Sequence, residues 1–341
     1  MRSDMNTPEV QAERCVHSYM ERASCRACVD CCPQRAWVLD EDQLGIDEQR
    51  CDGCDLCAAA CPEQAIQPRF SLRVQKTHRG TFAFAACVQA GISGRDAPRM
   101  ACLHGISLFN LLSLVQQGLE ELVVARGDCD QCPRGGGQRL ADRVQSLNRL
   151  LQARGKSPIA CLTLGAGAWK QHWEQVQTWV RQRPMSRRHF FRNTLIQAKQ
   201  PLETVLVAPA ASREPERFLL KAQRGDLVLA APQIDPQRCQ GCDACANLCP
   251  HDAIRLIHRD AYEIQADACT GCGICADVCE AKALELVRWE PLVQTQVSLN
   301  RYRCTACGVP YHLPAERRDA DLCPICRQHN PYRQLFQVLE G

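Results

Sequence analysis

The sequence predicts an α+β chain of several domains, in which a small α/β domain with a parallel sheet lies between two cysteine-rich modules and a cysteine-rich segment ends the chain. Three observations lead to this prediction. The 341 residues include 26 cysteines, most of them in Cys-x-x-Cys steps. One cysteine motif recurs on both sides of a central segment. Within that segment, short apolar runs alternate with helical patterns.

The composition and charge narrow the class of protein. The 41 basic and 38 acidic residues give a net charge of +3, which is not typical of a nucleic-acid binder, so we expect no nucleic-acid partner. Cys-x-x-Cys steps in a long chain indicate metal ligation in a reducing compartment. The first residues lack the apolar stretch of a signal peptide. The longest weakly polar run, 81–92, is shorter than the about 20 apolar residues that cross a bilayer. We therefore expect a cytoplasmic protein without a membrane span.

The recurring motif has the pattern C-x2-C-x2-C-x3-C. It occurs as CDGCDLCAAACP, CQGCDACANLCP and CTGCGICADVCE, which begin at Cys51, Cys239 and Cys269. Three closely spaced cysteines of this pattern suit one corner of a [4Fe–4S] cluster, and the fourth suits a second cluster. A tetrahedral zinc ion takes two ligands from each of two knuckles instead. The pair of motifs over 239–279 therefore predicts two [4Fe–4S] clusters with exchanged fourth ligands.

A fourth copy of the motif, upstream of Cys32, departs from the pattern. Cys28 and Cys25 are in register with it, but Arg22 occupies the next position. The nearest thiol is Cys15, which a longer loop would bring to the site. A neighbouring cysteine at position 31 is either a spare or an alternative ligand.

These motifs resemble the bacterial two-cluster ferredoxin family over residues 15–66 and 235–290. The resemblance implies a ferredoxin-like (βαβ)2 fold for each module and four [4Fe–4S] clusters in total. In the second module it implies one cluster on Cys239, Cys242, Cys245 and Cys279, and another on Cys269, Cys272, Cys275 and Cys249. In the first module it implies one cluster on Cys51, Cys54, Cys57 and Cys32, and another on Cys15, Cys25, Cys28 and Cys61. The alternative for the last set is a degenerate site that is empty or holds three irons. Cys279 precedes Glu280 instead of proline, for which we expect a small geometric cost.

The middle segment reads as strands TFAFAACV, ELVVA and PIACLTL separated by helices over 106–117 and 138–153. This alternation predicts a small α/β layer with a mostly parallel sheet. The first helix carries an apolar stripe that we expect to pack on the sheet, made of Leu108, Leu111, Leu112 and Val115.

Four cysteines of the middle segment are expected to meet at one edge of that sheet: Cys87, Cys102, Cys129 and Cys132. Their contexts FAACVQAG, RMACLHGIS and VVARGDCDQCPRGGG resemble the small (delta) subunit of methyl-viologen-reducing hydrogenase over about residues 80–180. The resemblance implies a [2Fe–2S] cluster that passes electrons between a hydrogenase or dehydrogenase and a partner reductase. The alternative is that these are buried strand cysteines, and we place Cys161 in the core on the same ground.

The last cysteines form two knuckles, CTACG and CPIC, separated by 15 residues. Four thiolates in two knuckles are typical of a zinc ribbon, and they are Cys304, Cys307, Cys323 and Cys326. A rubredoxin-like iron site is the alternative. His312 and His329 lie near the knuckles, and we expect both to be exposed loop residues.

We therefore divide the chain into a first module (1–75), an α/β domain (76–180), an Arg-rich linker (181–232), a second module (233–292) and a zinc-ribbon-like segment (293–341). The sequence carries no Ser-His-Asp set, Walker A loop or dinucleotide fingerprint. It predicts an electron-transfer polyferredoxin that relays single electrons within an oxidoreductase complex of the hydrogenase, formate dehydrogenase or heterodisulfide-reductase-like type. The alternative function is a redox- or iron-responsive regulator or maturation factor that binds a macromolecule through its zinc ribbon.

Overall fold

The computed structural model of the chain describes residues 7–39, 44–70, 72–93, 98–135, 139–181, 205–206, 221–317 and 321–328. It forms two compact units, one of Met1–Ser18 with Arg26–Phe218 and one of Tyr19–Cys25 with Leu219–Gly341. Most of the predicted Arg-rich linker, 181–232, lies outside the described residues. Among those that are described, no helix combines the length and the apolar character needed to cross a membrane.

The first module is built from two antiparallel strand pairs and several short helices. β1 (Glu9–Val10) pairs with β4 (Ile66–Gln67), and β2 (Trp37–Leu39) forms a hairpin with β3 (Leu44–Ile46). The helices are α2 (Ala27–Asp30) and α3 (Leu56–Ala60), preceded by η1 (Ala12–Arg14) and α1 (Val16–Tyr19). Trp37, Ala58 and Ile66 form the small apolar core with Cys57. Elements this short cannot bury enough apolar surface to be stable alone, so the cysteine sites must contribute to the stability of the module.

A six-stranded mixed sheet forms the centre of the first unit. Its order is β10-β5-β6-β8-β9, with β7 also paired to β6. The strands are β5 (Arg73–Thr77), β6 (Gly80–Cys87), β7 (Arg99–Met100), β8 (Leu119–Ala125), β9 (Ala160–Leu164) and β10 (Val205–Leu206). β6 is parallel to β7 and β8, and β8 is parallel to β9, whereas β5 is antiparallel to both of its neighbours. The parallel strands place their carboxyl ends at one edge, where the predicted cysteines lie.

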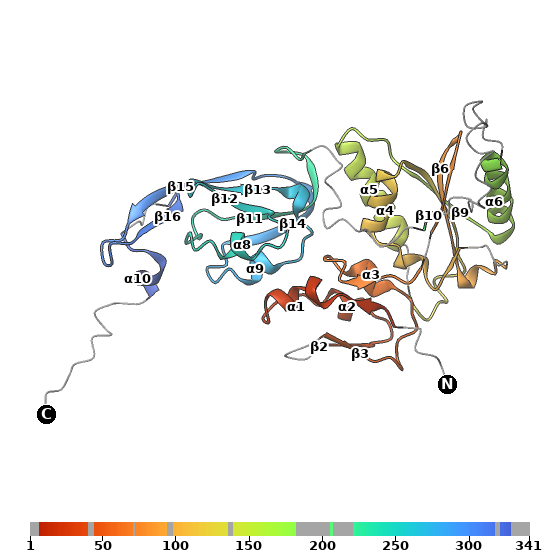
Figure 1. Ribbon diagram of the computed structural model, residues 1–341, viewed down its shortest axis with the longest axis horizontal. Coiled ribbons are helices and arrows are strands. Elements are labelled where there is room, and N and C mark those ends of the chain that lie inside the picture. Colours follow the sequence, from red (N-terminus) through yellow and green to blue (C-terminus); the bar gives the residue numbers. More distant parts are fainter. Residues whose placement is uncertain are drawn as a thin grey trace, which may run out of the picture. The chain divides into compact units, whose positions relative to one another are not determined.

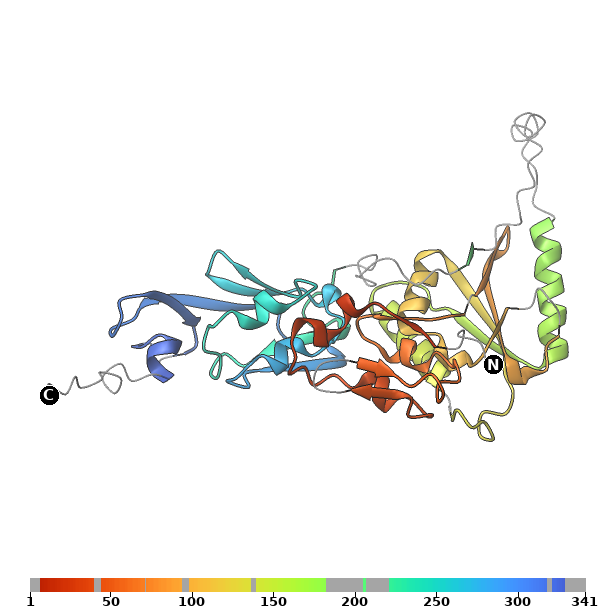
Figure 2. The same ribbon diagram turned by 60° about the horizontal axis from the view of Figure 1, so that its bottom comes forward.

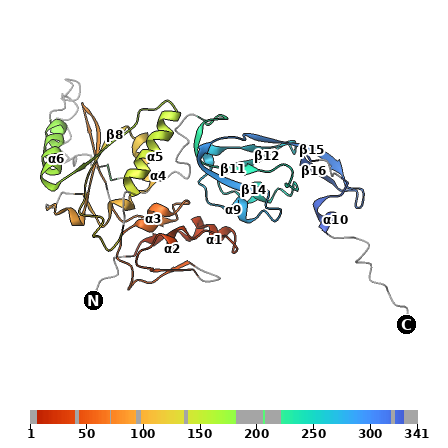
Figure 3. The same ribbon diagram turned by 180° about the vertical axis from the view of Figure 1, so that it is seen from behind.

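Helices cover both faces of this sheet. Figures 1 and 3, which view it from opposite sides, show α6 (Ala166–Arg181) on one face and α4 (Leu108–Gln116) with α5 (Arg139–Ala153) on the other. Ser107 caps α4, since its side chain accepts from the backbone N of Asn110 while the Asn110 side chain accepts from the backbone N of Ser107. Two shorter 3₁₀ helices, η2 (Val88–Ala90) and η3 (Leu103–Gly105), follow β6 and β7.

The apolar packing of the middle domain differs in part from the predicted stripe. Leu111 and Leu112 are fully buried, but Leu108 and Val115 are only half-buried, and the face shifts toward Phe109 and Leu114. Cys161, expected in the core, is half-buried because β9 is an edge strand of the sheet.

The second unit repeats the architecture of the first module and extends it. β11 (Leu227–Ile234) pairs antiparallel with β14 (Leu284–Pro291), and β12 (Ile254–Ile257) forms a hairpin with β13 (Ala261–Ile264). The helical elements are α8 (Ala244–Leu248), η4 (Ala266–Ala268), α9 (Ile274–Asp277) and α10 (Pro324–Gln328). β15 (Gln296–Arg303) pairs with β13 and turns into β16 (Pro310–Pro314), so the long blue hairpin of Figure 2 continues the sheet of this unit.

Two strands cross the domain limits expected from the sequence, and a third pairs with a strand on the other side of such a limit. β5 begins at Arg73, before the limit at 75, because it pairs with β6. β11 begins at Leu227 inside the expected linker, and β15 joins the C-terminal segment to the second module. Strand pairing depends on contacts between distant residues, so composition alone does not locate these limits.

Candidate metal and cluster sites

The fourth cysteine of each motif lies in the same kind of turn. Its Sγ accepts a hydrogen bond from the backbone N of the alanine four residues later. The donor–acceptor distances are 3.4 Å for Ala36 to Cys32, 3.3 Å for Ala65 to Cys61, 3.2 Å for Ala253 to Cys249 and 3.2 Å for Ala283 to Cys279. The residue before each alanine has a positive φ, and these residues are Arg35, Gln64, Asp252 and Lys282. The turn at Cys279 therefore has the geometry of the other three without the proline.

The conformation of the loop before each helix differs between the three complete motifs and the incomplete copy upstream of Cys32. Gly53, Gly241 and Gly271 have φ of 67°, 65° and 76°, and each lies just before the second cysteine of its motif. At Gly241 a Cβ would approach the carbonyl O of His312 to 2.1 Å, so only glycine fits. The helix N-caps that follow are also left-handed at Asp55, Asp243 and Gly273. In the departing copy, the N-cap of α2 is Arg26 with φ of −129°, so this loop lacks the shared geometry.

Three sets of four cysteines each line one cavity. Cys32 joins the cysteines of the 51–57 loop around the first cavity. Cys249 joins those of the 269–275 loop around the second, and Cys279 joins those of the 239–245 loop around the third. In every case the fourth cysteine comes from the partner motif, which is the exchange that the resemblance implies. The third cavity has a volume of about 310 Å³ and also reaches Pro324, Ile325 and Gln328 of α10.

The surroundings of these cysteines fit an iron–sulfur cluster. The second cavity is walled by Ile254, Ile274 and Leu286, and it offers thiols as its only soft donors. Burial raises the pKa of the thiols of Cys57 and Cys269 to about 12. The free thiols are therefore protonated at neutral pH, and cluster assembly must release protons. Four convergent thiolates in an apolar cavity suit a positively charged metal centre, such as the irons of a cluster, which balances their negative charge.

The remaining four cysteines of the first module are spread over short elements. Cys15 is the C-cap of η1 and Cys61 the C-cap of α3. Cys28 lies in α2 and packs with Cys61 against the core of Trp37 and Ile66. Cys25 lies two residues before α2.

Cys31 packs both against the core of the first module and toward the middle domain. It packs against the buried cluster of Cys54, Leu56 and Cys102, and its Sγ donates to the carbonyl O of Cys28 at 3.4 Å. Burial and the neighbouring Cys32 raise the pKa of its thiol to about 11.

The middle-domain cysteines lie where the parallel strands end, as the sequence predicts. Cys87 is the last residue of β6, Cys102 follows β7, and Cys129 and Cys132 lie in the loop after β8. Cys102 is buried, and burial followed by the charges of Cys87 and Cys132 raises the pKa of its thiol.

Buried His104 supports this group from outside the predicted set. Its Nδ1 accepts from the backbone N of Leu140 at 3.2 Å, so the neutral ring carries its proton on Nε2. Nε2 lies 3.6 Å from Cys129 Sγ and is placed to donate to it. Burial and the charges of Arg143 and Arg139 lower the pKa of His104, which favours this neutral form. A hydrogen bond to a ligating sulfur is a common means of adjusting a metal site.

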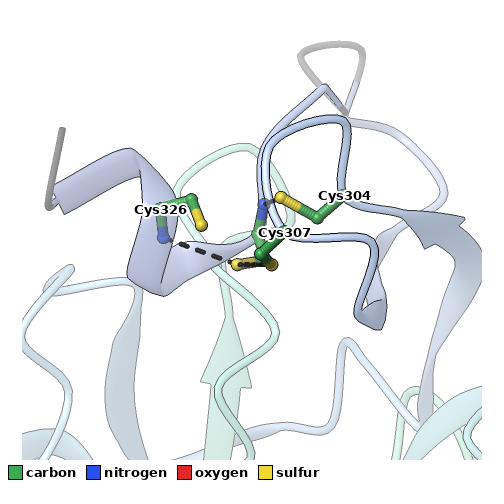
Figure 4. Close-up of side chains that lie close together, drawn as sticks. Cys304, Cys307 and Cys326 are labelled. Carbon is green, nitrogen blue, oxygen red and sulfur yellow. Dashed lines mark hydrogen bonds between the residues drawn. The ribbon is translucent and has the colours of Figure 1, made fainter. Parts of the chain in front are cut away.

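The C-terminal knuckles form a cysteine cluster in the second unit. Among the described residues, it is the one group of cysteines whose Sγ atoms all lie within 4.8 Å of one another, and its members are Cys304, Cys307, Cys323 and Cys326. Figure 4 shows Cys304 and Cys307 in the loop after β15 beside Cys326 of helix α10. Cys307 and Cys323 are 3.8 Å apart at Sγ. Four sulfurs around a tetrahedral ion with bonds of about 2.3 Å are also about 3.8 Å apart, so the group fits a single zinc or iron ion.

A thiolate is already favoured in this cluster. The backbone N of Cys323 donates to Cys304 Sγ at 3.3 Å. This bond and those from neighbouring amides lower the pKa of Cys304 to about 6, so its sulfur is charged at neutral pH.

His312 differs from the exposed loop residue that we expected, whereas His329 lies outside the described residues. His312 lies on β16 and is only 6% exposed. Its Nε2 is 2.8 Å from Asp243 Oδ1, which also accepts from the hydroxyl of Tyr262 at 2.6 Å. Burial raises the pKa of Asp243, but the hydrogen bonds with His312 and Tyr262 have a larger, opposite effect. The pKa is therefore lowered overall, and the carboxyl stays charged. The network ties the C-terminal hairpin to the loop that carries Cys242.

We expect Tyr262→Phe to destabilise the second unit by about 1–3 kcal/mol, because the buried Asp243 carboxylate loses a close donor. Urea unfolding followed by tryptophan fluorescence or circular dichroism measures the change as a lower midpoint. Tyr302→Phe is the matched control, since Tyr302 shares its sheet with Tyr262 and its hydroxyl has an exposed partner, Asn300, at 3.4 Å. Equal midpoints for the two variants would contradict the role of the network.

Comparison with protein families agrees with the two modules. The model of a 4Fe-4S dicluster domain matches residues 232–286, and that of a 4Fe-4S binding domain matches residues 44–67. The chain contains two ferredoxin-type 4Fe–4S domains. The prediction of iron–sulfur modules at both ends of the middle segment is thereby confirmed.

Curated relatives match the chain over short stretches. The thiosulfate reductase electron transfer subunit PhsB of Salmonella typhi is 38% identical over 64 residues, which are 17% of this chain and 33% of that protein. The putative oxidoreductase UacF of Escherichia coli strain K12 is 33% identical over 99 residues, 29% of this chain and 14% of UacF. The indolepyruvate oxidoreductase subunit IorA of Archaeoglobus fulgidus is 36% identical over 56 residues, 15% of this chain and 9% of IorA. The chain thus spans a third or less of the length of these relatives.

Several residues around the sites carry no signal in the sequence. Asp243 and His312 are 69 residues apart, and His104 and Leu140 are 36 apart. No motif contains both members of either pair, so only the fold shows that they meet. A polar residue inside a cysteine loop, such as Asp243 between Cys242 and Cys245, is the one feature that draws attention to such a position.

Proposed function

We propose that this chain is an electron-transfer subunit of an oxidoreductase complex. It relays single electrons between a dehydrogenase- or hydrogenase-type catalytic subunit and a partner reductase, in the cytoplasm. The observation that carries the proposal is the meeting of four cysteines from two motifs around each of three cavities. The names of the relatives, among them an electron transfer subunit and two oxidoreductases, support the same role.

The cysteine sets act as cluster ligands in this proposal. When bound, the clusters supply one-electron redox chemistry. The chain holds them through thiolates, excludes water with apolar walls such as Ile274, and supplies N–H donors such as that of Ala253 to the sulfurs. The middle-domain cysteines hold a [2Fe–2S] cluster, as in the hydrogenase delta subunit that this domain resembles. The C-terminal knuckles hold zinc.

Metal and sulfide analysis of anaerobically prepared protein tests the proposal. Four [4Fe–4S] clusters and one [2Fe–2S] cluster correspond to about eighteen iron atoms per chain, with equal sulfide and about one zinc. Dithionite should bleach the brown colour. An affinity pull-down from the native host should recover a flavin-, molybdenum- or nickel-containing subunit. A colourless protein with zinc but almost no sulfide would contradict the relay, and recovery with promoter DNA or an apo-enzyme would favour a regulator or maturation factor instead.

We expect Cys15→Ser to lower the iron content by one to four atoms per chain, whereas Cys31→Ser leaves it unchanged. Cys15 is the proposed fourth ligand of the departing set, and Cys31 packs toward Cys102 on the side of the middle domain. Iron and sulfide analysis of the two variants measures the difference. Unchanged iron in Cys15→Ser, or iron loss in Cys31→Ser, would reject this assignment.

A further inference from the structure

Arg134 joins the first module to the middle domain within the first unit. Its Nε donates to Asp52 Oδ2 at 2.7 Å, and its Nη1 donates to the carbonyl O of Ala101 at 2.9 Å. Asp52 belongs to the 51–54 cysteine loop of the first module, and Ala101 directly precedes Cys102. Arg134 itself follows the second cysteine of the CDQC loop by two residues. One guanidinium therefore connects three loops that each carry cysteines.

This ion pair is sheltered from water. The side chains of Arg134 and Asp52 are 16% and 27% exposed. Because a guanidinium is not deprotonated in proteins, the Arg134 side chain stays charged. An arginine that bonds with two of its nitrogens at once is held in one orientation.

The two domains are closely packed beside the ion pair. Cys54 and Cys102 belong to one buried cluster with Leu56, and α3 packs on η3. A Cβ at Gly105 would lie 3.0 Å from Asp55 Cβ and 3.2 Å from the carbonyl O of Cys54. A side chain at this position would require its neighbours to move by a few tenths of an ångström, so the cysteine loop of one domain lies closely against that of the other.

The guanidinium of Arg134 thus bonds to the residue that follows Cys51 and to the residue that precedes Cys102. We propose that Arg134 is a positioning residue that holds the cysteine sites of the first module and the middle domain side by side and places a shared positive charge between them. The two sites then form one electrostatically coupled pair. This inference rests on the proposed function, since it requires that both sites hold clusters.

The shared charge sets the direction of the expected effect. Reduction adds an electron to a site, and a nearby positive charge favours the reduced form. Arg134→Gln removes that charge and keeps a polar side chain, although one that is two atoms shorter. We expect the ratio of reduced to oxidised form at a given potential to fall about tenfold at both sites, which corresponds to a shift of about 59 mV for one electron.

An EPR-monitored redox titration of the full-length, anaerobically prepared chain tests the proposal. The signal of the first-module site is assigned by its loss in Cys54→Ser, and that of the middle-domain site by its loss in Cys102→Ser. Metal and sulfide counts on the unaltered protein come first. If the unaltered protein shows no EPR signal from the middle-domain site, the [2Fe–2S] part of the proposed function is wrong, and so is this inference.

Two other arginines provide matched controls. Arg126 Nη1 lies 3.9 Å from Cys129 Sγ in the middle domain. Arg50 precedes Cys51 and its bonds are to Asp47 and Arg35 of the first module. Arg126→Gln should shift at most the middle-domain signal and Arg50→Gln at most the first-module signal, whereas Arg134→Gln shifts both downward together.

Two further variants separate charge from packing. Arg134→Lys keeps the charge and should retain both potentials. Asp52→Asn removes the opposing charge and should shift both potentials upward, and this readout remains if Arg134→Gln does not retain its iron. With full iron content, unmoved signals in Arg134→Gln, movement of only one signal, or an equal shift in Arg134→Lys would each overturn the proposal and leave the proposed function standing.

Discussion

Cys275→Ser should lower iron and acid-labile sulfide by about four atoms each per chain. Cys275 is 8% exposed and lines the cavity that Cys249, Cys269 and Cys272 also line. A serine hydroxyl is a harder donor with a much higher pKa, and the apolar walls of Ile254 and Leu286 offer no replacement ligand. The whole [4Fe–4S] cluster is therefore expected to be lost, together with its contribution to the stability of the second unit.

Cys161→Ser is the control for this variant. Cys161 is half-buried, and burial raises the pKa of its thiol. It lies on β9, outside every proposed ligand set. Its iron and sulfide content should equal that of the unaltered chain. Both quantities are measured on protein prepared without oxygen, and full iron in Cys275→Ser would remove this cysteine from the ligand set.

Cys323→Ser should remove about one metal ion per chain and release the C-terminal hairpin. Cys323 is 5% exposed, lies 3.8 Å from Cys307 at Sγ, and donates its backbone N to Cys304. Structural zinc contributes about 10–16 kcal/mol to the folding of isolated zinc fingers. The short strand β16 has little apolar core of its own, so its amide protons should exchange much faster in the variant.

Val309→Ser is the matched change beside the other knuckle. Val309 lies between Cys307 and β16 and is 54% exposed, so the metal content and the protection of β16 should be retained. Elemental analysis and hydrogen exchange by mass spectrometry give the two readouts. Loss of an iron ion instead of zinc would assign the rubredoxin-like alternative, and unchanged metal in Cys323→Ser would remove the site.

The cysteine sites were predictable because their information is local. A motif of twelve residues contains the glycine at 241, the helix that starts at Ala244 and the turn at Cys249, so spacing indicates that its first three thiols converge, whereas the exchange of the fourth was implied by the resemblance. The strands of the middle domain followed from apolar runs for the same reason, and β6 and β8 lie within a few residues of the predicted positions.

Contacts between distant segments were not predictable. Asp52 and Arg134 are 82 residues apart, and nothing in either loop indicates that they meet. The expectation for His312 was wrong because a histidine between cysteine knuckles reads as solvated, whereas the β15–β16 register pairs it with Arg301 and brings it to Asp243. Strand β10 pairs with β5 across more than a hundred residues of sequence, so it could not be recognised in a polar segment.

The pairing of β15 with β13 decides where this protein can be divided. A fragment that stops at residue 292 would leave the backbone of Ala261 and Glu263 without the strand that now borders it. It would also expose the Tyr262 hydroxyl network, which needs His312 from β16. The smallest autonomous piece of this half of the chain therefore extends from about residue 221 through α10, and shorter fragments should aggregate through the bare strand edge.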